Sequence, residues 1–200
     1  LPQDPTLRLI GSEKIWERGA ALTSRLQSFE TEMLTEEENL VGLARINREL
    51  IAKVEAIDSP QRVVLDMDST EIPVYGQQEQ SAYNGHFECV CYHPLFCFNQ
   101  FGDCEAVKLR PGNVHSAHDW REVLDSIVAR YEGKGLRIYF RGDAAFANPG
   151  VYEYAEAKRF LYAIRLPSND VLEREIQHLL TRPVGRPSEK PVIRYHDFQY

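Results

Sequence analysis

The spacing of apolar residues in the first half of the chain predicts strands. Three strand-like runs follow one another, at residues 63–70, 86–99 and 104–109. The last two are separated by a short turn at residues 101–103, and no helical spacing of apolar residues fits between residues 63 and 110. Because consecutive strands with short links pair antiparallel, this region is expected to form an antiparallel meander.

The second half alternates helix and strand. Apolar residues from Trp120 to Tyr131 recur on one helical face, and glycines at 133 and 135 end that helix. A strand then runs from residue 137 to Asp143, a short helix begins at Pro149, and a fifth strand covers residues 160–165. The resulting order, β-β-β-α-β-α-β, predicts an α/β fold built on a mixed sheet.

Residues 1–59 are expected to form a separate, helical region. Residues 13–27 have partial helical character, and Thr35 with Glu38 forms a capping box that predicts a helix start. This helix is expected to end before Asp58-Ser59-Pro60. We interpret its apolar stripe as a face packed against a core; the stripe consists of Leu40, Leu43, Ile46, Leu50 and Val54, together with Asn47.

The composition is that of a globular protein. Of the 200 residues, 43% are hydrophobic and 26% are charged, which is ordinary for a folded domain. The longest apolar run, residues 89–98, is broken by His93 and Pro94 and is too short to span a membrane. The formal charge of −7 disfavours a simple nucleic-acid-binding module, although a metal-binding catalytic core can be acidic when its DNA contacts lie elsewhere. The chain starts at Leu1 rather than at a methionine, and we expect it to be part of a longer protein.

Four cysteines lie close together, at positions 89, 91, 97 and 104. His86 and His93 are nearby, so a zinc site is one interpretation, but the Cys-x-Cys spacing differs from the paired Cys-x-x-Cys of zinc knuckles. Free cysteines otherwise behave as small hydrophobic residues. We therefore interpret the cysteines as apolar residues of a protein in a reducing cytoplasm.

The candidate chemistry lies where the first strand ends. Asp66 and Asp68 are two residues apart, so on a strand they share one face while Leu65 and Met67 point to the other. Carboxylates at the end of a buried strand need a positive partner, and their hard oxygens suit Mg²⁺ or Mn²⁺. The alternative is a polar cluster that only ends the strand and begins a turn. A second strand-like run that stops at Asp143 favours the metal.

Several segments together resemble one family. The order of elements is that of a ribonuclease H-like core, and the motifs resemble DDE transposases of bacterial insertion sequences across most of residues 60–165. The matching segments are Leu65-Asp66-Met67-Asp68-Ser69-Thr70, Gly76-Gln77-Gln78-Glu79, Tyr83-Asn84-Gly85, Tyr92-His93-Pro94-Leu95, Leu109-Arg110-Pro111-Gly112-Asn113, and Arg141-Gly142-Asp143 followed by Phe146.

The resemblance implies roles for individual residues. Asp68 matches the first catalytic acid and Asp143 the second, with Asp66 as the nearest competitor on the same strand face. Both acids would hold Mg²⁺ or Mn²⁺ in a two-metal site. Arg110, Asn113 and Arg141 lie at strand ends, where DNA phosphate contact competes with turn formation and salt bridges.

The resemblance also implies partners and a domain division. The family acts on double-stranded DNA, at the ends of the element and in target DNA, as a homodimer on paired ends in the bacterial cytoplasm. Residues 1–59 would be an N-terminal helical region, 60–166 the catalytic core, and 167–200 the start of a β-rich insertion.

The third catalytic acid of the family is a Glu within Tyr-x-x-Arg-x-x-x-Glu-x-x-x-x-x-x-Lys. This pattern does not occur in the 200 residues, and Glu173 and Glu175 lack its context. The chain is therefore expected to be an incomplete and, by itself, inactive core.

Two alternatives stay open at this point. Residues 66–70 also resemble the first motif of haloacid-dehalogenase-type phosphatases, with the Gly-Asp at residues 142–143 as a metal-binding pair. Against this, that fold alternates strand and helix, and no second aspartate follows within residues 144–148. The other alternative is a non-catalytic transposase remnant.

Overall fold

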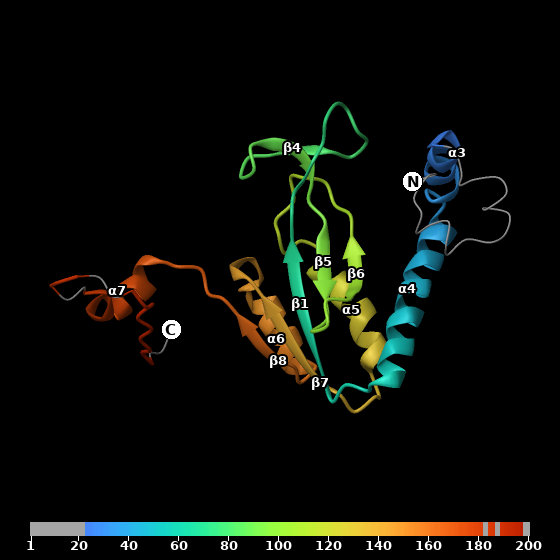
Figure 1. Ribbon diagram of the computed structural model, residues 1–200. Coiled ribbons are helices and arrows are strands. Elements are labelled where there is room, and N and C mark those ends of the chain that lie inside the picture. The colour runs from blue at the N-terminus through green and yellow to red at the C-terminus, as the bar shows by residue number, and fades with distance from the viewer. Residues whose placement is uncertain (1–22, 182–183, 187–188, 198–200) are drawn as a thin grey trace. The chain divides into compact units, whose positions relative to one another are not determined.

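A computed structural model describes residues 23–181, 184–186 and 189–197 of the chain. It divides into two compact units, Leu1–Pro60 and Gln61–Tyr200. The described part of the first unit is helical, and the strands lie in the second unit (Figure 1).

The N-terminal unit is helical in its described part. It contains α3 (Thr23–Ser28), a π-helical segment η1 (Phe29–Met33) and the long helix α4 (Glu37–Ile57). Of the helix expected over residues 13–27, the portion before residue 23 lies outside the described residues. Helix α4 ends as expected, with Asp58 as its C-cap.

The expected capping box does not form. The N-cap of α4 is Glu36, and no side chain caps the helix. The Thr35 hydroxyl instead donates to the carbonyl oxygen of Thr31, 2.8 Å away. The preceding π-helical segment supplies this carbonyl, so the hydroxyl is already committed when α4 begins.

The interpretation of the α4 stripe as a core-facing surface is also wrong for this structure. Its five apolar members are between 48% and 60% exposed, although they do share one side of the helix. The one buried apolar residue of α4 is Ile51.

The second unit is organised around a five-stranded mixed sheet with the order β6-β5-β1-β7-β8. Central strand β1 pairs antiparallel with β5 and parallel with β7, and β8 extends the parallel side. This is the strand order of a ribonuclease H-like core, which confirms the expected fold class. The strands are β1 (Arg62–Ser69), β5 (Leu95–Phe98), β6 (Cys104–Lys108), β7 (Arg137–Gly142) and β8 (Leu161–Ile164).

The antiparallel neighbour of β1 also overturns the phosphatase alternative. That fold alternates strand and helix, whereas here no helix intervenes between β1 and β6. All strands between them are joined by turns or loops, as the sequence pattern predicts.

The single strand expected over residues 86–99 is in fact two strands in two sheets. Residues Cys89–Tyr92 form β4, the middle strand of a small sheet with β2 (Ile72–Pro73) and β3 (Ala82–Asn84), whereas β5 belongs to the main sheet. The change occurs at His93-Pro94, because proline has no N–H with which to continue a ladder. His93 donates its N–H to the carbonyl of Arg110, 2.9 Å away, so the break is held from the neighbouring loop.

Two helices cover one face of the main sheet. Helices α5 (Trp120–Tyr131) and α6 (Pro149–Ala157) pack with the short 3₁₀ segment η2 (Ala144–Phe146) against the inward side chains of β1 and β7. The core includes Leu65, Leu124 and Phe140, each at most 1% exposed. A last helix, α7 (Asp170–Leu180), follows β8. Within the described ranges, no helix is both long and apolar enough to cross a membrane.

The other face of the main sheet, called the open face below, is only partly buried. Strand alternation and register put Val64, Asp66 and Asp68 of β1 on it beside Phe96 and Phe98 of β5. Phe98 is 36% exposed, whereas Leu95 and Cys97 on the opposite face have no exposed surface. The carboxylates are therefore on the side of the sheet away from the helices.

Candidate active site

The acidic residues of the two predicted strands lie at neighbouring strand ends. Met67 of β1 is opposite Gly142 of β7 in a parallel register. Asp68 follows Met67, and Asp143 follows Gly142, so the same register continued by one residue sets Asp68 beside Asp143. Neighbouring strands are about 4.8 Å apart, which is a separation that two carboxylates can bridge through a shared cation.

The end of β7 is shaped by a close approach. A side chain at Gly142 would place its Cβ 2.9 Å from the ring of Phe146, so only glycine lets this ring fold beneath the strand end. Asp143 then caps the 3₁₀ segment: its Oδ1 accepts from the N–H of Ala145 at 2.9 Å. These contacts fix the backbone of Asp143 while leaving the residue exposed.

Asp66 and Asp68 share a strand face but differ in their partners. Asp66 Oδ2 pairs with the guanidinium of Arg141 at 2.5 Å, across the β1–β7 pair. Asp68 is exposed, and its Oδ1 accepts from the N–H of Ser69 at 2.8 Å. Among the described residues neither Asp68 nor Asp143 has a cationic partner, so their charges are available to a bound cation.

The remaining predicted residues are placed apart from this pair. Arg110 is 2% exposed, and its guanidinium donates to the backbone carbonyls of His93, Ser116 and His118. Burial lowers the pKa of Arg110. Its contacts hold the loop before α5 against the break between β4 and β5, so in this structure Arg110 organises the loop.

Asn113 lies on the same loop but is exposed. It lines a pocket of about 520 Å³ beside the small sheet, with Tyr83, His86, His93 and His115 among the other lining residues. The loop approaches β3 closely here, since a Cβ at Gly112 would overlap the carbonyl oxygens of Ala82 and Cys91. The structure therefore groups Asn113 with the small sheet, and Arg141 with the acids.

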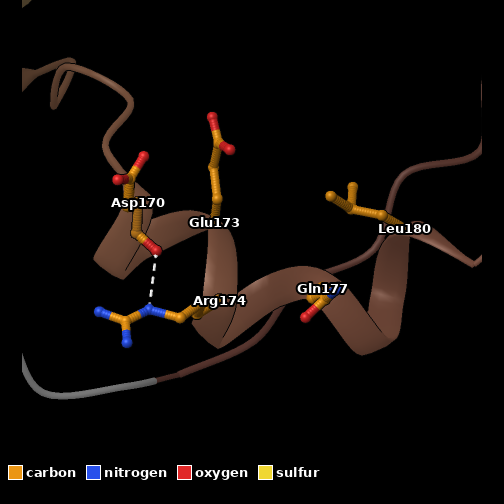
Figure 2. A pocket seen from close by; sticks show the side chains of 5 residues that line it. All are labelled: Asp170, Glu173, Arg174, Gln177 and Leu180. Atoms are coloured by element: carbon orange, nitrogen blue, oxygen red, sulfur yellow. Dashed lines mark hydrogen bonds between the residues drawn. The ribbon is translucent and has the colours of Figure 1, made fainter.

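The carboxylates of α7 form a separate group. Figure 2 shows Asp170, Glu173 and Arg174 at a pocket of about 650 Å³ on this helix, where Arg174 Nε donates to the Asp170 carbonyl at 3.1 Å. Glu173 Oε1 accepts from the hydroxyl of Ser168 at 2.8 Å, so this carboxylate stabilises the start of the helix.

One buried polar cluster was not found from the sequence. Glu105 of β6 is 4% exposed and pairs with Arg130 of α5, while the Tyr131 hydroxyl donates to its Oε1 at 2.7 Å. Asn99 donates to the same oxygen at 3.1 Å. The available signal was a charge near the start of a strand-like run, since a buried charge requires a partner.

The cysteines are not arranged as ligands. All four are free, and Cys91 and Cys97 are buried. Burial raises the pKa of the Cys97 thiol, with a smaller contribution from Glu105, so the protonated form is favoured. No group of three or more His, Cys, Asp or Glu side chains suited to a metal occurs in the described part of the chain.

The donor set at the strand ends nevertheless fits magnesium. Mg²⁺ is commonly held by one or two carboxylates, with water and substrate phosphates completing its octahedron. Asp68 and Asp143 supply two hard oxygen donors from neighbouring strands, exposed to solvent.

The sequence profile of one family covers the chain. The chain belongs to the transposase DDE domain group 1 family, which matches residues 1–200. No curated protein sequence gives a significant match.

Solved structures give weaker likenesses. The catalytic domain of Mos1 mariner transposase is 13% identical, with 66% of this chain and 62% of that chain covered and a TM-score of 0.39. The HTLV-2 integrase catalytic core domain, a dimeric form in complex with magnesium, is 14% identical, with 60% and 69% covered and a TM-score of 0.32. The chain thus spans less than two thirds of that Mos1 domain, and the fold assignment above rests on the strand order itself.

Proposed function

We propose that this chain is the metal-binding part of a transposase that cuts and joins DNA at the ends of an insertion sequence. The observation that carries the proposal is the register of β1 and β7, which sets Asp68 beside Asp143. Membership of the DDE transposase family supports it independently.

In this proposal Asp68 and Asp143 hold Mg²⁺ or Mn²⁺, in a two-metal site once a third acid is supplied. The ions, when bound, would neutralise charge on the phosphate and activate the attacking oxygen. Water, and then the freed 3′-hydroxyl, attacks phosphodiesters at the element ends and in target DNA. Strand pairing fixes the two carboxylates before DNA arrives, which reduces the cost of ordering them.

The ion pair with Arg141 supports Asp68 over Asp66 as the first acid. A carboxylate that is neutralised by a guanidinium at 2.5 Å is a poorer ligand for a divalent cation. Arg141 is also half-exposed, so it can contact a phosphate from this position while it orients Asp66.

The open face supports a place for the third acid. Its apolar side chains, Phe96 and Phe98, stack 5.8 Å apart and flank the two aspartates. An amphipathic helix on this face would bury them and could present a glutamate to the metal.

We propose that the chain is divided into domains as in the family: residues 1–59 form an N-terminal region, 60–166 the core and 167–200 the start of the insertion. We also propose that the protein binds double-stranded DNA, acts as a homodimer on paired ends and is located in the bacterial cytoplasm.

Metal binding by the 200-residue chain tests the assignment of the acids. Isothermal titration with Mn²⁺ should show affinity reduced by more than about tenfold in Asp68→Asn and in Asp143→Asn, because each removes a direct ligand. Asp66→Asn is the matched control, on the same strand and face, and should bind nearly as tightly as the original chain. Equal losses in Asp66→Asn and Asp68→Asn would show that Asp66 is a ligand as well.

DNA cleavage tests the activity itself. In the protein that carries this chain and a third acid, Asp143→Asn should abolish cleavage at the element ends and leave end binding largely unchanged. Cleavage by this variant at the original rate would refute the proposed function.

A further inference from the structure

Helix α4 carries a heptad repeat. The residues Leu40, Leu43, Asn47, Leu50, Val54 and Ile57 are separated alternately by three and four positions. This spacing has a period of 3.5 residues, which is that of a and d positions in a coiled coil. Over the 21 residues of α4 the repeat is kept without interruption.

The a and d residues, called the heptad seam below, are exposed. Leu40 is 52%, Leu43 48% and Leu50 57% exposed, and the exposed fraction rises to 88% at Ile57. Such a continuous apolar stripe on a helix surface is unusual unless another element covers it. Within the N-terminal unit, the described residues leave it largely uncovered.

We propose that the heptad seam of α4 pairs with α4 of a second copy of this chain, as a parallel two-stranded coiled coil. The seam can pair with its own copy, because Leu43 and Leu50 fill d positions and the β-branched Val54 fills an a position, the combination that favours two strands. Leu40 is the first a residue and Ile57 the last d residue. Asn47 occupies a central a position, where a single asparagine fixes the register and limits the assembly to a dimer.

Charge complementarity sets the direction of the pairing. In this heptad Lys53 is a g residue and Asp58, the C-cap of α4, is the following e residue. Parallel helices bring g of one copy beside the next e of the other, so Lys53 meets Asp58 of the second copy twice by symmetry. An antiparallel pair would not bring these charges together. This surface lies outside the acidic site, and the proposal stands without the DNA chemistry.

The mass of the 200-residue chain in solution tests the pairing. Sedimentation equilibrium should give twice the 23.0 kDa of one chain. A Leu43→Glu/Leu50→Glu variant should dissociate, with the dissociation constant raised at least about 100-fold, because four carboxylates would enter the seam. Val41→Glu is the matched control: Val41 is 59% exposed on the same helix but at a b position, and this variant should remain dimeric.

Two results would overturn the proposal. A monomeric original chain would mean that the seam does not pair with a second copy. A dimer that persists in the Leu43→Glu/Leu50→Glu variant would place the interface elsewhere. Far-UV circular dichroism of each variant confirms that the chain is still folded when its mass is measured.

Disulfide formation tests whether the two α4 helices are parallel. This test leaves the charge of the heptad seam unchanged. In a parallel, in-register dimer the two residues at position 40 face each other, so Leu40→Cys should yield a covalent dimer on mild oxidation. In an antiparallel pair position 40 lies beside position 57, about 25 Å along the helix. Val41→Cys controls for the native cysteines and should give no more covalent dimer than the original chain. A dimeric Leu40→Cys variant that does not crosslink would refute the parallel arrangement.

Discussion

Helices α4 and α5 carry the same sequence signal and have opposite surroundings. Five apolar residues of α5, from Val123 to Tyr131, are at most 5% exposed, whereas the apolar stripe of α4 is about half exposed. Both patterns predicted an amphipathic helix, and both helices form. The difference shows that the spacing of apolar residues determines which side of a helix is apolar. Which other element packs against that side depends on residues elsewhere in the chain.

The two helices also differ in their polar contacts. The start of α5 is tied to β6, where Lys108 Nζ lies 3.0 Å from Asp119 and 2.5 Å from Glu122. Its end is tied to the same strand through Arg130 and Glu105. One ion pair of α4, between Arg45 and Glu49, instead joins two turns of the same helix. Contacts to the sheet therefore fix α5 in one position.

The largest effect is expected from the buried pair that ends α5. Glu105→Ala removes the carboxylate that pairs with the Arg130 guanidinium, 12% exposed, and should cost about 3–5 kcal/mol of unfolding free energy. Urea denaturation measures this loss. The control is Glu122→Ala, whose side chain is 69% exposed and whose removal should cost less than about 1 kcal/mol. Similar losses in the two variants would mean that the buried pair does not hold α5.

A smaller loss is expected from the apolar face of α5. Leu124 is 1% exposed, and Leu124→Ala should cost about 3 kcal/mol through lost burial and the cavity that remains. Leu43→Ala in α4 makes the same chemical change on an exposed stripe. It should alter the unfolding of the sheet-containing unit by less than about 0.5 kcal/mol. Equal effects would remove the distinction between the two helices.

The smallest effect concerns the charge at the start of α5. The hydrogen bond from Lys108 lowers the pKa of Asp119 below its usual value near 3.9, against a weaker effect of burial. The ionised form is therefore favoured in the folded state, so its stabilisation is present above about pH 4 and is lost as the pH falls through the folded-state pKa. The contribution should not exceed about 1 kcal/mol, since the side chain is 28% exposed.

Asp119→Asn isolates this charge. Asp119 has a φ of 59°, a left-handed conformation that asparagine also tolerates, so the substitution preserves the backbone. The difference in unfolding free energy between the original chain and this variant should be largest near pH 6 and should shrink towards pH 3. A difference that is independent of pH would mean that the ion pair does not contribute.

The regular parts of the fold were predictable because each strand or helix carries its own pattern. The alternation of Leu65 and Met67 with two aspartates correctly put Asp66 and Asp68 on one face, away from the core. The strand predicted from residue 137 to Asp143 was equally clear, and it ends one residue earlier, at Gly142. The choice of Asp68 over Asp66 stays a prediction.

The parts that were missed depend on contacts between distant segments. The break at His93-Pro94 is held by the loop that contains Arg110, and no local pattern shows that an arginine 17 residues later will bond the His93 carbonyl. The same holds for Glu105, whose partner is on the next helix. From the sequence alone, an arginine at a strand end is expected on the surface. Only the folded chain shows that Arg110 is buried.

The register of β1 and β7 also determines when, during synthesis, the two acidic residues can come together. Asp68 and Asp143 are 75 residues apart, and β7 enters the sheet only after the meander and α5 have been made. Pairings between such distant segments form slowly, because a long loop must close first. A nascent chain that has emerged only as far as α5 therefore has Asp66 and Asp68 on β1 but lacks Asp143. The pair of Asp68 and Asp143 forms only once β7 has paired with β1.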